Sequence, residues 1–389
     1  MTAPLLRFTE FTDDWEETTL ENLAEVERGK FSVRPRNDPR YFGGEMPFVQ
    51  TGDVAGSDMY LKGYSQTLNA DGIKVSKVFP ADTILITIAA NIGDTTITRY
   101  AVACPDSVVA IQSKKDKANT IFLKNLIDLQ KEFLDSQATQ NAQKNINLQV
   151  LKPLELFAPS IEEQTKIASF LSNVDEKISQ LTQKHELLSQ YKQGMMQKLF
   201  NQQIRFKADD GSEFGEWENI SVKEIFDVTR GQVLAVSNTV SVADADYKYP
   251  VFSSQTKQKG LMGFYKKYLF EDALTWTTDG ANAGDVNFRK GKFYCTNVCG
   301  VLLSKKGYAN LCIAEILNKV TRKYVSYVGN PKLMNNVMSE IPITIPRDIK
   351  EQTKIANFLS SIDQKIEVVA QQIEQAKQWK KGLLQQMFV

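Results

Sequence analysis

The chain of 389 residues has little of what most enzymes use for chemistry: one histidine, His185, and four cysteines. A single imidazole leaves little scope for acid–base catalysis by histidine. Four cysteines in a chain of this length argue against a disulfide framework and favour a reducing compartment. Cys295, Cys299 and Cys312 lack a fourth metal ligand, because His185 lies in another segment. We therefore predict no metal site and no cofactor in this chain, and we expect buried, unreactive thiols.

Long hydrophobic runs and a strong net charge are also missing. No stretch of about 18 apolar residues is present, so no membrane-spanning helix is predicted. The N-terminus lacks a basic stretch followed by an apolar core, so no signal peptide is predicted and we expect a cytoplasmic protein. The net charge of +1 excludes nucleic-acid binding through overall basicity. Any binding of DNA must therefore use local basic patches.

Motifs of common enzyme classes are absent as well. The sequence contains no G-x-x-x-x-G-K-[ST] phosphate loop, no G-x-G-x-x-G that follows a strand, and no Asn/Asp-Pro-Pro-aromatic tetrapeptide of amino-methylating enzymes. The nearest approach to a catalytic pattern is Asp106 followed by Gln112 and Lys114, which is similar to a metal-nuclease arrangement. Few carboxylates are available there for a hard cation. We predict no catalytic residue; a nuclease remains an alternative, which predicts metal-dependent cutting by the chain alone.

The sequence does contain an internal repeat. The hexapeptide EQTKIA occurs at Glu163 and again at Glu351, 188 residues later. The longer segments EQTKIASFLSNVDEKI and EQTKIANFLSSIDQKI agree at 12 of 16 positions. Such repetition determines the architecture before any single element does, because each copy folds as one structural unit.

Heptad spacing of apolar residues predicts that each copy opens a long coiled-coil helix. The first helix is expected to run from Ile161 to Phe200, 40 residues or about 60 Å, and each helix follows a proline, Pro159 or Pro346. A single apolar stripe cannot be buried alone, so we expect the two helices to pair antiparallel. His185 and two lysines interrupt the stripe, and the histidine is interpreted as a register device rather than a ligand. The residues predicted to pair the helices are Ile167, Leu171, Val174, Ile178, Leu181 and Leu188, with Ile355, Leu359, Ile362, Ile366, Val369 and Ile373.

The segments outside the helices are also duplicated. WEETTLENLAEVERGK from Trp15 aligns with WENISVKEIFDVTRGQ from Trp217, and we expect an acidic amphipathic helix that ends at a C-capping glycine, Gly29 or Gly231. ANIGD at Ala90 matches ANAGD at Ala281. Short period-two segments such as TILITIA and SVVAIQS predict strands.

The predicted fold class is therefore α+β. It has two mostly-β target-recognition domains separated by two long antiparallel coiled-coil helices, related by an internal pseudo-two-fold repeat. The predicted boundaries are 1–158 for the first β domain, 159–202 for the first helix, 203–345 for the second β domain and 346–389 for the second helix.

Basic and amide side chains gather in loops of both β domains. Residues 1–27 carry one arginine and eight acids, whereas residues 28–40 carry five basic residues and one acid. Arginine reads guanine and Asn or Gln reads adenine in the major groove, while lysine mostly binds phosphate. For each single residue a solvated loop remains the simpler alternative. The predicted DNA contacts are Arg28, Lys30, Arg34, Arg36, Arg40, Gln50, Thr51 and Asn91, with Arg230, Ser253, Gln255, Lys257, Lys259, Thr278, Asn282, Arg289 and Lys290.

Three segments resemble the specificity subunit of type I restriction-modification systems: YFGGEMPFVQTGDV, TILITIAANIGDTTIT and the twice-written EQTKIA helix. The resemblance implies a subunit without a catalytic centre that reads a bipartite DNA sequence, one half-site per domain. It implies double-stranded DNA, two methyltransferase subunits and a restriction/translocase subunit as partners, with S-adenosylmethionine, ATP and Mg held by those subunits. The first loops of the two domains differ, so DNA contacts cannot be copied between them.

The near-identical outer faces of the helices are where one partner could bind twice. The predicted docking residues are Lys166, Phe170, Asp175 and Lys177, with Lys354, Phe358, Asp363 and Lys365. An alternative is that these residues only support their own β domain. A second functional hypothesis is a two-headed scaffold that binds protein or glycan, which would show no salt-dependent affinity for DNA.

Overall fold

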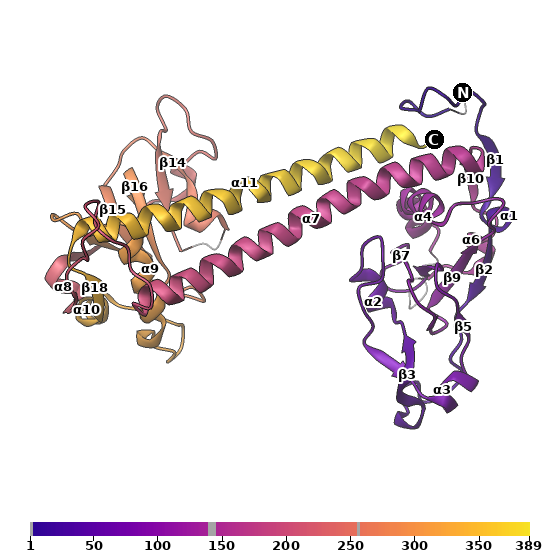
Figure 1. Cartoon of the computed structure of the whole chain (residues 1–389), viewed down its shortest axis with the longest axis horizontal. Coiled ribbons are helices and arrows are strands. Elements are labelled where there is room, and N and C mark those ends of the chain that lie inside the picture. Colours follow the sequence, from indigo (N-terminus) through magenta and orange to yellow (C-terminus); the bar gives the residue numbers. More distant parts are fainter. Residues whose placement is uncertain (1–2, 139–144, 255–256) are drawn as a thin grey trace. The chain divides into compact units, whose positions relative to one another are not determined.

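The computed structural model describes residues 3–138, 145–254 and 257–389. It divides into two compact units, Met1–Leu181 with Gln372–Val389, and Thr182–Gln371. Each unit holds one β domain and parts of both long helices, α7 (Ile161–Phe200) and α11 (Ile349–Met387), which Figure 1 shows with the other elements.

The β domain of unit 1 is built from three small sheets. The first has the strand order β2-β9-β6-β7, the second β4-β3-β8-β5 and the third β1-β10. The strands are β1 (Glu16–Thr19), β2 (Ala24–Arg28), β3 (Phe42–Phe48), β4 (Gln66–Leu68), β5 (Val78–Phe79), β6 (Ile84–Thr87), β7 (Thr95–Ile97), β8 (Val102–Ala103), β9 (Val108–Ser113) and β10 (Glu155–Ala158).

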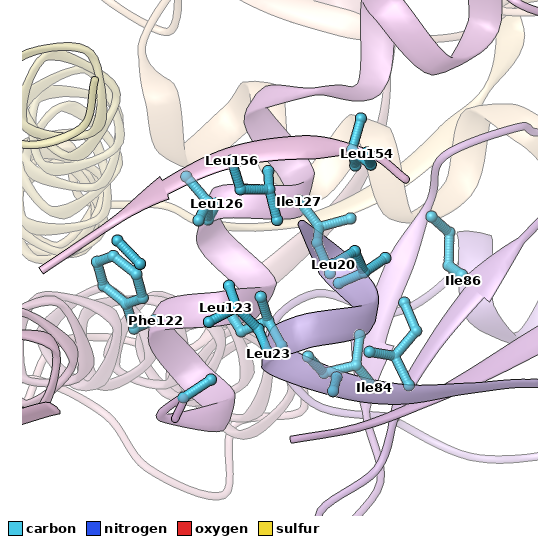
Figure 2. Close-up of a cluster of buried hydrophobic side chains, with 14 of the residues drawn as sticks. Leu20, Leu23, Ile84, Ile86, Phe122, Leu123, Leu126, Ile127, Leu154 and Leu156 are labelled. Carbon is cyan, nitrogen blue, oxygen red and sulfur yellow. The ribbon is translucent and has the colours of Figure 1, made fainter. Parts of the chain in front are cut away.

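Helix α4 covers one face of the first sheet. Its apolar residues recur at the three- and four-residue spacing of a helix face, and Leu123 and Ile127 share a buried cluster with Ile84 and Ile86 of β6 (Figure 2). Leu85, between those isoleucines, points to a second cluster, as the alternation of a strand requires. The helices are α1 (Leu20–Leu23), η1 (Pro39–Tyr41), α2 (Thr51–Ala55), α3 (Ala70–Lys74), α4 (Thr120–Leu129), α5 (Lys131–Ser136) and α6 (Leu148–Leu151).

The β domain of unit 2 has a six-stranded sheet in the order β12-β17-β15-β16-β13-β14 and a two-stranded sheet, β11-β18. Helix α9 packs against β16. The elements are β11 (Trp217–Ser221), α8 (Val222–Ile225), β12 (Asp227–Arg230), η2 (Val236–Asn238), β13 (Tyr249–Phe252), η3 (Lys257–Gly260), β14 (Leu261–Tyr265), β15 (Phe270–Thr277), β16 (Val286–Cys295), β17 (Cys299–Leu303), α9 (Leu311–Val320), η4 (Thr321–Tyr324), α10 (Asn335–Glu340) and β18 (Pro342–Pro346).

Strand pairing confirms the internal repeat. The order β2-β9-β6-β7 in unit 1 corresponds to β12-β17-β15-β16 in unit 2, with antiparallel neighbours in both. In each domain one parallel pair also occurs, β3 with β8 and β13 with β16. The predicted α+β class with two β domains and two long helices is confirmed. The ten-residue helices α4 and α9 within the β domains were not predicted.

The acidic helix predicted after Trp15, and its copy after Trp217, is wrong. The chain instead forms a strand, one helical turn and a second strand, because β1 pairs with β10 and β2 with β9. The single turn of α1 produced the apparent helical spacing. Gly29 and Gly231 are not C-caps, because each follows a strand, β2 or β12. A Cβ at Gly29 would lie 2.3 Å from the carbonyl oxygen of Pro105, and one at Gly231 would lie 2.1 Å from the carbonyl oxygen of Cys295. Glycine is required at both positions by a close backbone approach.

The long helices begin and end close to the predicted residues, and the residues predicted to pair them are buried or half-buried in their units. In unit 1 Lys380 of α11 bonds Asp175 of α7 at 2.6 Å, and in unit 2 Lys192 of α7 bonds Asp363 of α11 at 2.7 Å. The two helices therefore contact each other within each unit. The two lysines that interrupt the apolar stripe each have a carboxylate on the opposite helix, which explains why charge is tolerated there.

Candidate nucleic-acid interface

The glutamate of each EQTKIA copy is a buried anchor. Glu163, 1% exposed, accepts two bonds from Arg7, Nε–Oε1 at 2.8 Å and Nη2–Oε2 at 2.7 Å, and one from Trp15 Nε1 at 3.4 Å. Such bidentate pairs are the strong form of a charge-assisted hydrogen bond. The guanidinium hydrogen bond to Glu163 raises the pKa of Arg7 despite the opposing effect of burial.

Unit 2 repeats this anchor. Glu351, also 1% exposed, accepts from Arg205 Nε at 3.0 Å, Arg205 Nη2 at 2.8 Å and Trp217 Nε1 at 3.3 Å. Sequence reasoning missed both arginines. The signal was present, because an Arg-Phe pair followed by a tryptophan occurs at Arg7 and again at Arg205.

The glutamine of each copy fastens the start of its helix. Gln164 accepts from the backbone N of Asn119 and donates to the carbonyl oxygens of Lys117 and Pro159. Gln352 accepts from Asn310 and donates to the carbonyl oxygen of Pro346. The repeated hexapeptide therefore ties each long helix to its own β domain.

Two predicted docking residues of unit 1 contact the N-terminal segment. Lys166 Nζ lies 2.8 Å from Glu10 Oε1 and 5.4 Å from the ring centroid of Phe8. Phe170 meets Phe8 edge to face, with ring centroids 5.8 Å apart, and Trp379 at 6.1 Å.

Unit 2 has the corresponding contacts. Lys354 Nζ lies 2.6 Å from Asp209 Oδ1, and the rings of Phe358 and Phe206 are 5.6 Å apart. Asp175 and Asp363 form the interhelical ion pairs described above, so they support the helix pair. Lys177 and Lys365 are exposed. The predicted docking residues thus divide into residues with intramolecular contacts, of which Lys166 is also exposed, and one further exposed lysine in each copy, Lys177 or Lys365.

The basic loop of the first domain is ordered around two aspartates. Arg28 Nε donates to the carbonyl oxygen of Asp106 at 2.6 Å, and Arg36 Nη2 pairs with its carboxylate at 2.8 Å. Arg40 pairs with Asp38 at 2.6 Å, which lowers the pKa of Asp38. These arginines are exposed, and so are Lys30, Arg34 and Asn91.

Gln50 and Thr51 lie at the start of helix α2 and are half-buried. Gln50 belongs to a capping box, in which its backbone N donates to Asp53 Oδ2 at 2.8 Å. Its side chain donates to Gln66 Oε1 at 2.5 Å. Capping therefore fixes the position of this amide.

The second domain arranges its predicted contacts differently. Arg230, Lys259 and Lys290 are exposed, and Ser253 and Asn282 are half-buried. Gln255 and the side chain of Lys257 lie outside what the structure describes. The remaining two predicted contacts, Thr278 and Arg289, are buried.

Thr278 and Arg289 do not lie on exposed loops, contrary to expectation. Thr278 is 1% exposed and donates to the carbonyl oxygen of Val298 at 2.9 Å. Arg289 is 8% exposed, and its Nη2 donates to the carbonyl oxygen of Lys259 at 2.7 Å. Period-two spacing identifies the face of a strand, but not whether a later loop covers that face.

The residues of the nuclease alternative do not come together as a site. Asp106 pairs with Arg36 before β9 begins, whereas Lys114, beyond its other end, donates to the carbonyl oxygen of Glu21 at 2.7 Å. Within the described ranges, no group of three or more His, Cys, Asp or Glu side chains is placed to hold a metal ion.

All four cysteines are buried and free. Burial raises the pKa of Cys104 to about 12 and that of Cys312 still further. Cys299 differs, because a hydrogen bond from Cys295 and the nearby charge of Arg289 lower its pKa.

Comparison with known proteins identifies the family of this scaffold. Residues 12–190 and 215–378 each match the family model for the type I restriction modification DNA specificity domain. The chain belongs to this family. Each matched stretch contains one β domain and reaches into the helix that follows it, so the family unit coincides with the internal repeat.

Relatives of this specificity-domain chain extend over most of its length. It is 24% identical over 394 aligned residues to the type I restriction enzyme MjaVIII specificity subunit of Methanocaldococcus jannaschii, covering 89% of this chain and 88% of that one. It is 29% identical to a Mycoplasma pneumoniae protein named as a type I specificity subunit, covering 56% of this chain and 79% of that protein.

Solved structures share the fold. The crystal structure of a type I restriction-modification system S subunit from M. genitalium aligns with a TM-score of 0.68 at 17% identity, over 100% of this chain and 99% of that one. A chain from a structural study of assembly and conformational transition in a type I system aligns with a TM-score of 0.56 at 13% identity, over 95% and 96%. Of the helices that the structure describes, none combines the length and the apolar character needed to cross a bilayer.

Proposed function

We propose that this chain is the non-catalytic DNA-recognition subunit of a type I restriction-modification complex. It reads an asymmetric bipartite site, with one half-site for each β domain and a gap set by the helices. The observation that carries the proposal is a duplicated scaffold with unlike loops. The strand order and the Glu–Arg–Trp anchors repeat, whereas the first domain presents an exposed arginine loop and the second has a buried arginine, Arg289, on its sheet.

A direct test is to map methylated adenines in cells with and without this gene. The proposal predicts that one bipartite motif loses methylation when the gene is removed. Exchanging residues 28–40 for the loop of a relative should alter one half of the motif and leave the other half unchanged, because the two domains read independently. An unchanged methylation map after gene removal would contradict the proposal.

Partners supply the chemistry in this proposal. Two methyltransferase subunits bind S-adenosylmethionine and methylate adenine, and a restriction subunit uses ATP and Mg for translocation and cleavage. The duplicated helix surface supports binding of the same partner twice. Lys177 and Lys365 are the predicted docking residues that remain exposed and equivalent in both copies.

Charge reversal tests this docking. Lys177→Glu alone, or Lys365→Glu alone, should remove one of two copurifying methyltransferase subunits, and the double variant should remove both. Lys184→Glu is the control, because Lys184 is an exposed lysine of α7 whose equivalent in α11 is Gln372. Retention of two partner subunits by the double variant would assign docking to another surface.

A further inference from the structure

A cavity of about 210 Å³ lies on one face of the six-stranded sheet in unit 2, where Ser253, Lys259 and Gly260 also line it. Its lining includes Ser253, Lys259, Thr275, Asn282, Asn287 and Arg289. Liquid water takes about 30 Å³ per molecule, so the cavity has room for several waters or one compact polar group.

Strand alternation explains why this cavity is polar. Thr275 of β15 and Asn287 of β16 are cross-strand partners, and Arg289 stands two residues further on the same face. The adjacent pair, Trp276 and Val286, belongs to the apolar cluster in which α9 packs, although Trp276 also lines the cavity. An alternating polar face normally meets solvent. Here Thr275 is 2% exposed and Arg289 is 8% exposed, so these two side chains are enclosed, whereas Asn287 is half-buried.

Arg289 carries a buried positive charge in this cavity. Its Nε donates to Thr275 Oγ1 at 3.0 Å, its Nη2 to the carbonyl oxygen of Lys259 at 2.7 Å, and its guanidinium carbon lies 3.7 Å from the ring centroid of Phe252. Burial lowers the pKa of Arg289 to about 10, which leaves it protonated at neutral pH.

No carboxylate in the described parts of the chain neutralises this charge. Asp285 also lines the cavity, but its carboxylate is ion-paired with Arg322 at 2.9 Å. Burying a charge is unfavourable unless it is paired. Hydrogen bonds to a hydroxyl and a carbonyl satisfy individual N–H groups of Arg289, but they do not neutralise its positive charge.

We propose that this cavity binds a phosphate group through Arg289, with the Thr275 hydroxyl and the Asn287 amide beside it. The planar guanidinium fork matches phosphate oxygens, and the dianion or diester supplies the missing negative charge. The phosphate comes either from the DNA backbone or from a free phosphate compound. Only the first source rests on the function proposed above.

The site itself is tested on the full-length chain with inorganic phosphate alone. Thermal unfolding is followed against phosphate concentration at constant ionic strength, with chloride as the balancing anion. Wild type should be stabilised, and Arg289→Met should weaken the apparent phosphate affinity about tenfold or more. Arg347→Met is the matched control, because Arg347 is an exposed arginine of the same unit that is not among the predicted DNA contacts, and it should behave as wild type.

A wild type that phosphate does not stabilise, or an Arg289→Met variant that responds as wild type does, overturns the site. Should Arg289→Met fail to fold, Asn287→Leu removes a lining amide while keeping the charge, and it should reduce the response to phosphate. An unchanged response in folded Asn287→Leu would remove Asn287 from the site.

The source of the phosphate is tested by the salt dependence of DNA affinity. Loss of one backbone contact lowers the slope of log K against log salt by about 0.9. A decrease of that size in Arg289→Met identifies the DNA backbone; an unchanged slope, with the phosphate response lost, identifies a free phosphate compound. Wild type that binds phosphate but not DNA would contradict the proposed function and leave the site standing.

Discussion

At the scale of single residues, buried charges decide how each long helix is attached. Glu163 and Glu351 are nearly inaccessible, yet each is paired with an arginine and a tryptophan that lie 134 to 156 residues away in the chain. Removing one member of a buried ion pair leaves the other member unpaired and desolvated. The need to keep the buried carboxylate paired, and not helix propensity, therefore determines which residues can occupy these positions.

Glu163→Gln is expected to lower the free energy of unfolding of unit 1 by about 3 kcal/mol, because Arg7 loses its carboxylate partner. Urea unfolding followed by the fluorescence of tryptophan, which includes Trp15, measures the change. Glu162→Gln is the matched control, since Glu162 is exposed on the same turn. Equal stability of the two variants would show that the anchor contributes nothing.

At the scale of elements, the long helices are held by two kinds of contact. Apolar residues at heptad spacing bury the seam, and Lys192 and Lys380 cross it to carboxylates on the opposite helix. Burial lowers the pKa of Lys192, but the hydrogen bond to Asp363 and the charge of Glu315 outweigh this effect, so the pKa is raised. A seam lysine is thus compatible with close packing of the helices.

Leu171→Ala should destabilise unit 1 by about 3 kcal/mol, because Leu171 is fully buried in the cluster that also contains Met387 and Phe388 of the C-terminal segment. Chemical denaturation gives the difference. Val368→Ala, at a side chain of α11 that is 46% exposed, should change stability by less than about 0.5 kcal/mol. A small effect at Leu171 would show that the seam is not tightly packed.

At the scale of the whole molecule, duplication within one chain allows the two β domains, which we propose to be the readers, to diverge. A homodimer repeats one reader and favours palindromic sites, whereas two fused copies can recognise different half-sites. The predicted separation of these half-sites depends on the helices, because they are continuous α-helices of 40 and 39 residues.

Inserting four residues at matching positions of α7 and α11 lengthens the helices by about 6 Å, equivalent to about two base pairs at about 3.4 Å each. The gap in the methylated motif should lengthen accordingly when methylated adenines are mapped. A control with the same four residues inserted in the exposed loop around Gly211 should leave the gap unchanged. An unchanged gap in the helix variant would show that the helices do not set the spacing.

The periodicity of apolar residues predicted much of the fold. The heptads and the repeated EQTKIA identified both long helices, their starts after proline and the residues between them, because an apolar stripe of that length can be buried only against a similar partner. The helix predicted for the acidic segment after Trp15 was wrong. Four helical residues between two strands give the sequence a local helical spacing, whereas the strands are decided by pairing with distant segments.

The sequence by itself determined the duplication, the long helices, the family and the segments that carry basic and amide side chains. Only the tertiary structure decided which charges are paired or enclosed: Glu163 is paired with Arg7, and Arg289 is buried against the backbone of Lys259. The physical reason is the distance along the sequence over which each feature is determined. Repeats and periodicity are read from neighbouring residues, whereas burial of a charge depends on what the chain brings over it from a distant segment.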